Sequence, residues 1–192
     1  MMDIQELITS RRTIRQFAPD LISRTQIEKI VDAGRLAPSA ANLQPLEFIA
    51  VENREIRDRI FPCLKWAAYI HPAGDPRPGQ EPAAYVIVAV DTKIREKMYE
   101  YDVGASVENM ALSAWGEGIA SCWLISIDKP MIQSILEIPE HVRVDSVLAL
   151  GYPAEASVVE EFRDSPRYWK DDRGNFHVPK RPLASVLHFD KY

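Results

Sequence analysis

The sequence lacks the short motifs that mark many catalytic and nucleotide-binding sites. It contains neither G-x-G-x-x-G nor G-x-x-x-x-G-K-[S/T], which argues against a Rossmann dinucleotide site and a P-loop. H-E-x-x-H and G-x-S-x-G are also missing, and the four histidines have no ligand spacing. Residues 126–129 fit S-x-x-K without its S-D-N and K-T-G partners, so a helix cap is the better explanation. With no metal site and no nucleophile triad, a bound organic cofactor is the natural source of chemistry.

Cysteine and long apolar runs are also scarce, and the net charge is negative. Cys63 and Cys122 are the only cysteines and lack C-x-x-C spacing, which predicts reduced, buried thiols in a cytoplasmic protein. The chain has no uncharged apolar run of about 18 residues and no recognisable signal peptide, so we expect no membrane segment. A net charge of −5 argues against a nucleic-acid partner. The 192 residues suit one domain, which we place at 1–192.

Hydrophobic periodicity predicts an α+β fold in which helices cover a sheet. Five helices are expected: near 3–9, over 23–36 after the capping box of Ser23 and Gln26, over 54–66, over 102–117, and after the cap Asp128. Four strands are expected, over 46–52, 84–90, 120–127 and 144–150. Asp102 is expected to cap its helix, and Trp66, Trp115 and Trp123 to lie in the core. From about residue 155 the pattern weakens. We expect an irregular C-terminal arm whose large apolar residues pack on a partner subunit.

Two segments have a composition that suits a phosphorylated, planar ligand. Residues 10–17 read S-R-R-T-I-R-Q-F, and their guanidinium and hydroxyl groups match the acceptor oxygens of a phosphate. Residues 37–45 read A-P-S-A-A-N-L-Q-P, a loop of small polar residues that a flat ligand can approach closely. Taken separately, the first is explained better by surface charge and the second by ordinary turn chemistry.

Four motifs in order carry a resemblance to a known family. They are S-R-R-T-I-R-x-F, P-S-A-x-N-x-Q-P, G-I-A-S-C-W and, near the C-terminus, P-K-R-P. Over nearly its whole length the chain resembles the nitroreductase family of FMN enzymes. The resemblance implies a central, mostly antiparallel sheet flanked by helices. It also implies a homodimer with FMN at the interface and a domain-exchanged arm at about 155–192.

The resemblance also implies a set of cofactor-binding residues. The flavin phosphate and ribityl chain would contact Arg11, Arg12, Thr13, Arg15, Lys180 and Arg181. The loop of the other subunit would contribute Pro38, Ser39, Ala40 and Asn42. The strand end beside the flavin would contribute Trp123, Leu124, Ile125 and Ser126, with the backbone N–H groups of the last two facing N5 and O4. No catalytic side chain and no metal ligand is implied, because the chemistry belongs to FMN.

The implied activity is ping-pong hydride transfer through flavin N5, from NAD(P)H to a nitroaromatic, quinone or related planar acceptor. Ile125 and Ser126 stand where many relatives have glycine-containing pairs, and their larger side chains leave other functions open. These are reductive dehalogenation, dehydrogenation of a small metabolite, and a flavin-binding module without catalysis. Lys65, Trp66, Tyr69 and His71, in the proline-rich region 62–82, are expected to help form a lid over the substrate.

Overall fold

A four-stranded antiparallel sheet lies at the centre of the fold. In the computed structural model, which describes residues 3–192, its strand order is β1 (Leu46–Val51), β2 (Ala84–Asp91), β4 (Val142–Gly151) and β3 (Ala120–Leu124). Each neighbouring pair is antiparallel. The apolar run predicted as a central strand is β2, which is buried along almost its whole length between β1 and β4. The α+β fold class is therefore confirmed.

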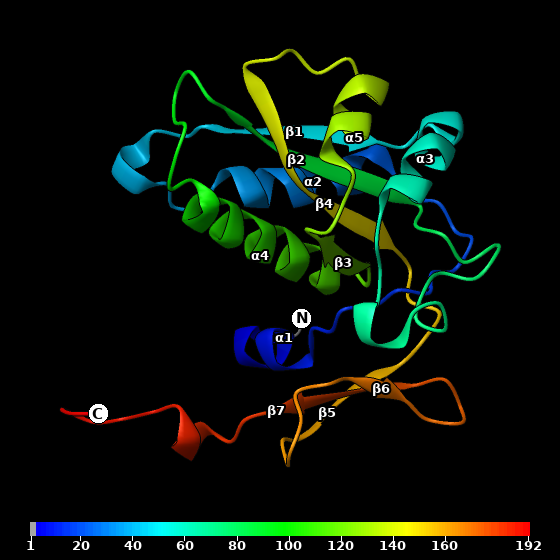
Figure 1. Cartoon of the computed structure of the whole chain (residues 1–192), viewed down its shortest axis with the longest axis vertical. Helices are drawn as coiled ribbons and strands as arrows, with labels where there is room; N and C mark the ends of the chain where they lie inside the picture. Colours follow the sequence, from blue (N-terminus) through cyan, green and yellow to red (C-terminus); the bar gives the residue numbers. More distant parts are fainter. Residues whose placement is uncertain (1–2) are drawn as a thin grey trace.

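Helices cover both faces of this sheet (Figure 1). On one face, α2 (Arg24–Arg35) and α4 (Glu100–Gly116) pack on Val86, Val88 and neighbouring side chains. On the other, α3 (Arg54–Ile60) and α5 (Lys129–Ile135) pack on Tyr85 and Ile87. This division follows from strand geometry, since successive side chains of β2 point to opposite faces.

The predicted helix signals are found at their expected places. The Ser23–Gln26 capping box begins α2 with both of its reciprocal hydrogen bonds. The side chain of Asp128 caps α5, and Pro130 lies in the first turn. The helix expected over 54–66 is shorter than predicted: α3 ends at Ile60, and Pro62 lies in the 3₁₀ turn Phe61–Cys63 that follows. Two further 3₁₀ turns are Ala40–Asn42 and Ala68–Ile70.

The N-terminal segment adds a short stretch to the β3 edge of the sheet. After α1 (Ile4–Ser10) the chain is extended, and Thr13 forms a parallel bridge with Ser121. The backbone N–H of Ile14 donates to the carbonyl of Ser121 at 3.1 Å. The strand predicted over 120–127 ends earlier, at Leu124, because Ile127 pairs with Leu64 instead of continuing along β4.

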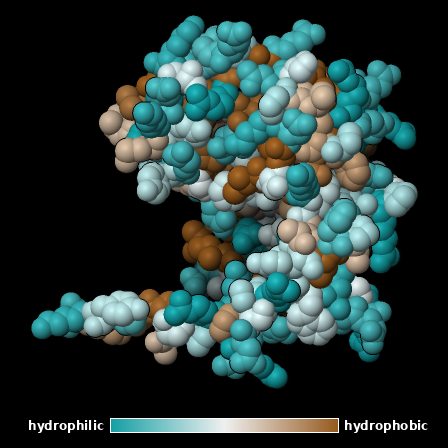
Figure 2. Space-filling model, in the orientation of Figure 1, coloured by the Kyte–Doolittle hydropathy of each residue, from teal (hydrophilic) through white to brown (hydrophobic). Residues whose placement is uncertain are grey.

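The C-terminal region contains a second sheet, which corrects the expectation of an irregular arm. Parallel β5 (Ser157–Glu161) and β7 (Phe176–Lys180) pair side by side, and β6 (Trp169–Lys170) joins β7 on its other side. Beyond the 3₁₀ turn Leu183–Ser185, the last residues project from the body, and Figure 2 shows a hollow beside them. Within residues 3–192, none of the helices has the length and apolarity needed to cross a membrane.

Candidate functional site

Arg11 and Arg15 lie in the extended segment beside β3, and both have a buried donor without an acceptor. The Nε of Arg11 is 3.3 Å from Glu108 Oε1, close enough for an ion pair, yet the geometry makes no hydrogen bond. The Arg15 guanidinium lies over the rings of Tyr168 and Phe176, at 5.1 and 4.9 Å from their centroids. Its Nε is also buried and unpaired. Buried donors are nearly always hydrogen-bonded, and these two guanidinium groups therefore have donor capacity left for an anion.

Arg12 increases the positive charge of this segment. Its Nη1 donates to the carbonyl of Arg11 at 2.6 Å. Partial burial lowers the pKa of Arg12, and the neighbouring charge of Arg11 lowers that pKa further. Both effects disfavour the charged form, and a bound anion would offset both.

Glu155 fixes the position of the basic segment. Its Oε1 accepts from the backbone N–H of Arg15 at 2.6 Å, and its Oε2 accepts from Lys170 Nζ at 3.0 Å. The Glu155 side chain is only 4% exposed and that of Lys170 is 13% exposed. This ion pair ties the N-terminal segment to the second sheet, because Lys170 belongs to β6. The sequence offered no signal for Glu155, since its partners lie 140 and 15 residues away along the chain.

Lys180 and Arg181 are not brought to the other basic residues within one chain. Both side chains are exposed, and Arg181 Nη2 donates to the carbonyl of Ser185 at 2.5 Å. Across residues 3–192, no hydrogen bond or ion pair links either residue with Arg11, Arg12 or Arg15. That these two groups of cations share one phosphate therefore stays a prediction.

The end of β3 presents two free backbone donors. Ile125 and Ser126 are exposed, and their N–H groups form no hydrogen bond with other described residues. Leu124 is buried, whereas Trp123 is 40% exposed on the edge strand. The expectation that Trp123 lies in the core is thus wrong, since its side chain is 40% exposed although its neighbours in β3 are buried.

A cavity of about 340 Å³ lies next to Ser126. Its lining residues are Leu64, Lys65, Trp66, Ala67, Ala68, His71, Asp75 and Ser126. Trp66 Nε1 and Asp75 Oδ1 are both buried without a hydrogen-bond partner, and His71 Nδ1 is 2.8 Å from Asp75 Oδ2. Two residues that line the cavity thus each have one polar atom without a hydrogen bond. Lys65, Trp66 and His71 were expected here, whereas Asp75 had no signal beyond its place in the proline-rich loop.

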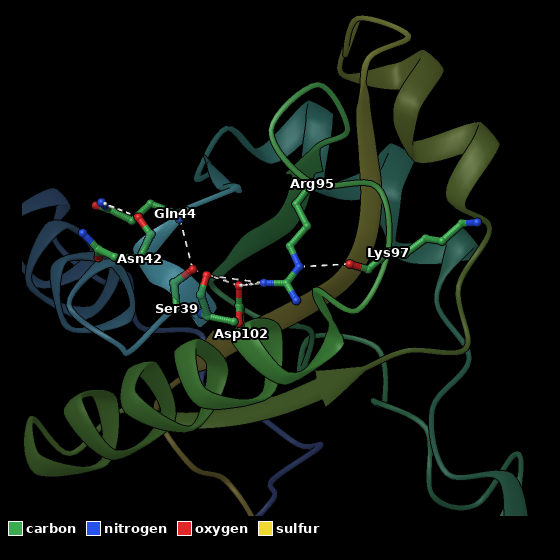
Figure 3. A network of polar contacts seen from close by, with 7 residues as sticks. Ser39, Asn42, Gln44, Arg95, Lys97 and Asp102 are labelled. Atoms are coloured by element: carbon green, nitrogen blue, oxygen red, sulfur yellow. Dashed lines mark hydrogen bonds and ion pairs between the residues drawn. The ribbon is translucent and has the colours of Figure 1, made fainter.

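The loop that follows α2 is held by a carboxylate from α4 (Figure 3). Asp102 Oδ2 accepts from the Ser39 hydroxyl at 2.9 Å, and Oδ1 accepts from the Ala40 N–H at 3.1 Å. The expectation that Asp102 caps its helix is wrong: the N-cap is Tyr99, and Asp102 lies within the first turn with its carboxylate directed to the loop. Pro38, Ala40 and Asn42 of the same loop are exposed.

Comparisons with known proteins show which family the chain belongs to. A sequence model described as the Nitroreductase family matches residues 8–152. A protein provisionally named NADH dehydrogenase/NAD(P)H nitroreductase in Archaeoglobus fulgidus is 32% identical over 91% of this chain and 95% of its own. An iodotyrosine deiodinase from Haliscomenobacter hydrossis is 27% identical, covering 82% of each chain. The solved structure of an FMN-dependent nitroreductase from Clostridium difficile superimposes with a TM-score of 0.70, at 20% identity over 97% of this chain and 98% of that one. The chain belongs to the nitroreductase family.

Proposed function

We propose that this protein binds FMN and uses it to transfer hydride from NAD(P)H to a planar acceptor. As a nitroreductase-family member it is an oxidoreductase. The observation that carries the proposal is the pair of buried guanidinium Nε atoms, on Arg11 and Arg15, that make no hydrogen bond, although Arg11 has an ion pair with Glu108. A phosphate dianion supplies several strong acceptors, and charge-assisted hydrogen bonds to it are stronger than those between neutral groups.

The residues at the end of β3 fit the other end of the same cofactor. Thr13 pairs with Ser121 at the start of β3, and the free N–H groups of Ile125 and Ser126 follow its end. A phosphate at the basic segment and a ring at the strand end would therefore lie along one edge of the sheet. FMN bound there would supply the two-electron redox chemistry that links NAD(P)H to the acceptor. The two N–H groups would hold the ring edge and stabilise electron-rich atoms near them.

The 340 Å³ cavity next to Ser126 is the proposed acceptor site. Its volume lies within the range of about 300–1,000 Å³ that is usual for small-ligand sites. The unpaired Trp66 N–H would donate to a nitro or quinone oxygen, both of which accept hydrogen bonds. Trp66 also shields one side of the cavity from water, since it packs with Phe61 at a centroid distance of 5.9 Å.

The second half of the site belongs, in this proposal, to a second copy of the chain. The loop with Pro38, Ser39, Ala40 and Asn42 would approach FMN from the partner subunit. Lys180 and Arg181 would reach the phosphate through the exchanged C-terminal arm. Support comes from the exposed apolar side chains of that arm, among them Leu183, which is 70% exposed, and Phe189, which is 80% exposed. Burying such groups in a dimer is favourable.

The test begins with purification of the full chain and a search for bound flavin. We expect a yellow protein with flavin absorbance, dimeric in solution, that oxidises NAD(P)H when a quinone or nitroaromatic is supplied. Substituting Arg11→Gln and Arg15→Gln together should weaken FMN binding, whereas Arg54→Gln, at an exposed ion pair far along the chain, should not. Colourless protein that also ignores added FMN contradicts the proposal. Flavin that is bound but never reoxidised by any small acceptor would instead indicate a binding module without catalysis.

Reductive dehalogenation is a second candidate, favoured by the likeness to the deiodinase of H. hydrossis. The same FMN site would serve, with a halogenated phenol in place of the nitroaromatic or quinone. Halide release from an iodinated phenol, measured beside quinone reduction with the same reductant, separates the two activities.

A further inference from the structure

We propose that Asp102 is a positioning residue that makes Ser39 a hydrogen-bond acceptor toward FMN, so that the loop recognises an N–H or O–H of the cofactor. The inference rests on the proposed function, because it assumes that residues 38–42 contact FMN. It concerns the Ser39–Asp102–Arg95 network drawn in Figure 3, which joins the loop to α4 and to the segment before that helix.

The hydrogen-bond inventory of Ser39 leads to this conclusion. A serine hydroxyl has one proton to donate and two lone pairs to accept. Ser39 donates its proton to Asp102 Oδ2 at 2.9 Å, and one lone pair accepts from the backbone N–H of Gln44 at 3.0 Å. One lone pair remains. A ligand at Ser39 must therefore supply a donor, which in FMN is the imide N3–H or a ribityl hydroxyl.

Asp102 can impose this polarity because it is held as a buried carboxylate. Its side chain is 4% exposed, and Arg95 Nη1 lies 3.7 Å from Oδ2. Arg95 is itself fixed, since its Nε donates to the carbonyl of Lys97 at 2.9 Å. A carboxylate beside a guanidinium accepts hydrogen bonds and donates none, so the Ser39 proton cannot turn toward the ligand without leaving Asp102 short of a partner.

The loop depends on this anchor because its backbone is strained. Ala41, Asn42 and Gln44 have φ values of 54°, 55° and 52°, in the left-handed region that non-glycine residues rarely adopt. Such conformations persist only where the surroundings hold them, and they cluster at functional sites. Asp102 binds both Ser39 and the N–H of Ala40, directly before the strained residues. The carboxylate thus sets both the polarity of Ser39 and the position of the loop.

The space behind the loop does not offer an alternative cofactor site. The cavity lined by Ser39, Asp102 and Ser106 measures about 160 Å³ within one chain, below the range of about 300–1,000 Å³ that is usual for small-ligand sites. The Ser106 hydroxyl in it is buried and unpaired among the described residues, which is typical of a pocket that holds ordered water. FMN would therefore meet the exposed residues of the loop.

A double-mutant cycle tests whether Asp102 acts through Ser39. The variants are Asp102→Asn, Ser39→Ala and the two combined, in the full-length protein, with the dissociation constant of FMN measured from flavin fluorescence on dilution. In Asp102→Asn the new amide donates to Ser39, which turns the serine proton toward a cofactor group that is also a donor. We expect the dissociation constant to rise about tenfold in Asp102→Asn and to change less than twofold when the same substitution is made on Ser39→Ala. Asp145→Asn, at another partly buried aspartate paired with a lysine, is the matched control and should leave FMN binding unchanged.

The outcomes separate this inference from the proposed function. Wild-type protein without FMN affinity would refute the proposed function itself. FMN binding that Asp102→Asn leaves unchanged, or weakens equally with and without the Ser39 hydroxyl, would refute the positioning role alone, since a merely structural carboxylate acts the same in both backgrounds. Repeating the cycle with N3-methyl-FMN identifies the donor: coupling that disappears assigns N3–H, and coupling that persists assigns a ribityl hydroxyl.

Discussion

The ion pair of Glu155 and Lys170 gives the most quantitative prediction about this protein. Replacing Glu155 with Gln keeps an acceptor for the Arg15 N–H but leaves the Lys170 ammonium facing an amide, with only 13% of its side chain exposed. Breaking a buried pair by removing one partner costs about 3–5 kcal/mol. Retention of the Arg15 hydrogen bond places the expected loss near the lower end, at about 3 kcal/mol. For a domain of this size, that lowers the midpoint of thermal unfolding by about 6–12 °C.

The assay is thermal unfolding followed by circular dichroism, at one protein concentration and one FMN concentration, because both shift the midpoint. Asp58→Asn is the control. Its ion pair with Arg54 is exposed, with side chains 68% and 86% accessible, and should be worth less than about 1 kcal/mol. Replacing both partners, as Glu155→Gln with Lys170→Met, should recover much of the loss, because the Arg15 N–H keeps its acceptor and no unpaired ammonium stays buried. A midpoint for Glu155→Gln within 2 °C of wild type would refute the argument that this pair is desolvated and ties the two parts of the chain together.

Three further predictions follow from other parts of the structure. Burial raises the pKa of Cys122 to about 11, so this thiol should resist iodoacetamide at pH 8 in the folded protein, which mass spectrometry checks. The free energy of unfolding should fall as pH rises from about 9 toward 11, because the thiol ionises there in the unfolded chain but not in the folded one; unfolding measured against pH checks this. Gly151→Ala should cost about 1–3 kcal/mol in denaturant unfolding because its Cβ would lie 2.6 Å from the Phe17 ring, whereas Gly104→Ala, in open space within a helix, should stabilise by up to about 1 kcal/mol. Trp66→Phe should raise KM for a quinone about tenfold by removing the unpaired donor, while FMN affinity stays unchanged. Steady-state kinetics measure KM and flavin titration measures the affinity. A KM equal to that of wild type would show that Trp66 is not part of the acceptor site.

Local patterns in the sequence were enough to predict most of the elements. The near-continuous apolar run at 84–90, the Ser23–Gln26 capping box and the Asp128 cap each act over a few residues, so their effects can be predicted from the sequence directly. The four-part motif resemblance likewise identified the family before any fold was known. The short strands after residue 155 escaped prediction because each holds only two to five residues and depends on its neighbours for pairing.

Which side chains meet was decided by the tertiary structure. Asp102 reads as a cap in sequence because helix starts favour aspartate, and only the approach of the loop at 39–40, 62 or 63 residues earlier, turns its carboxylate to Ser39 and Ala40. Arg15 is one of three similar cations in sequence, but the fold places it over two rings and leaves its Nε without an acceptor. Residue types and local spacing thus determined the family, the elements and the kinds of groups available. Packing between distant segments determined which of those groups are buried, paired or left free for a ligand, because desolvation and hydrogen bonding depend on neighbours that the order of residues does not specify.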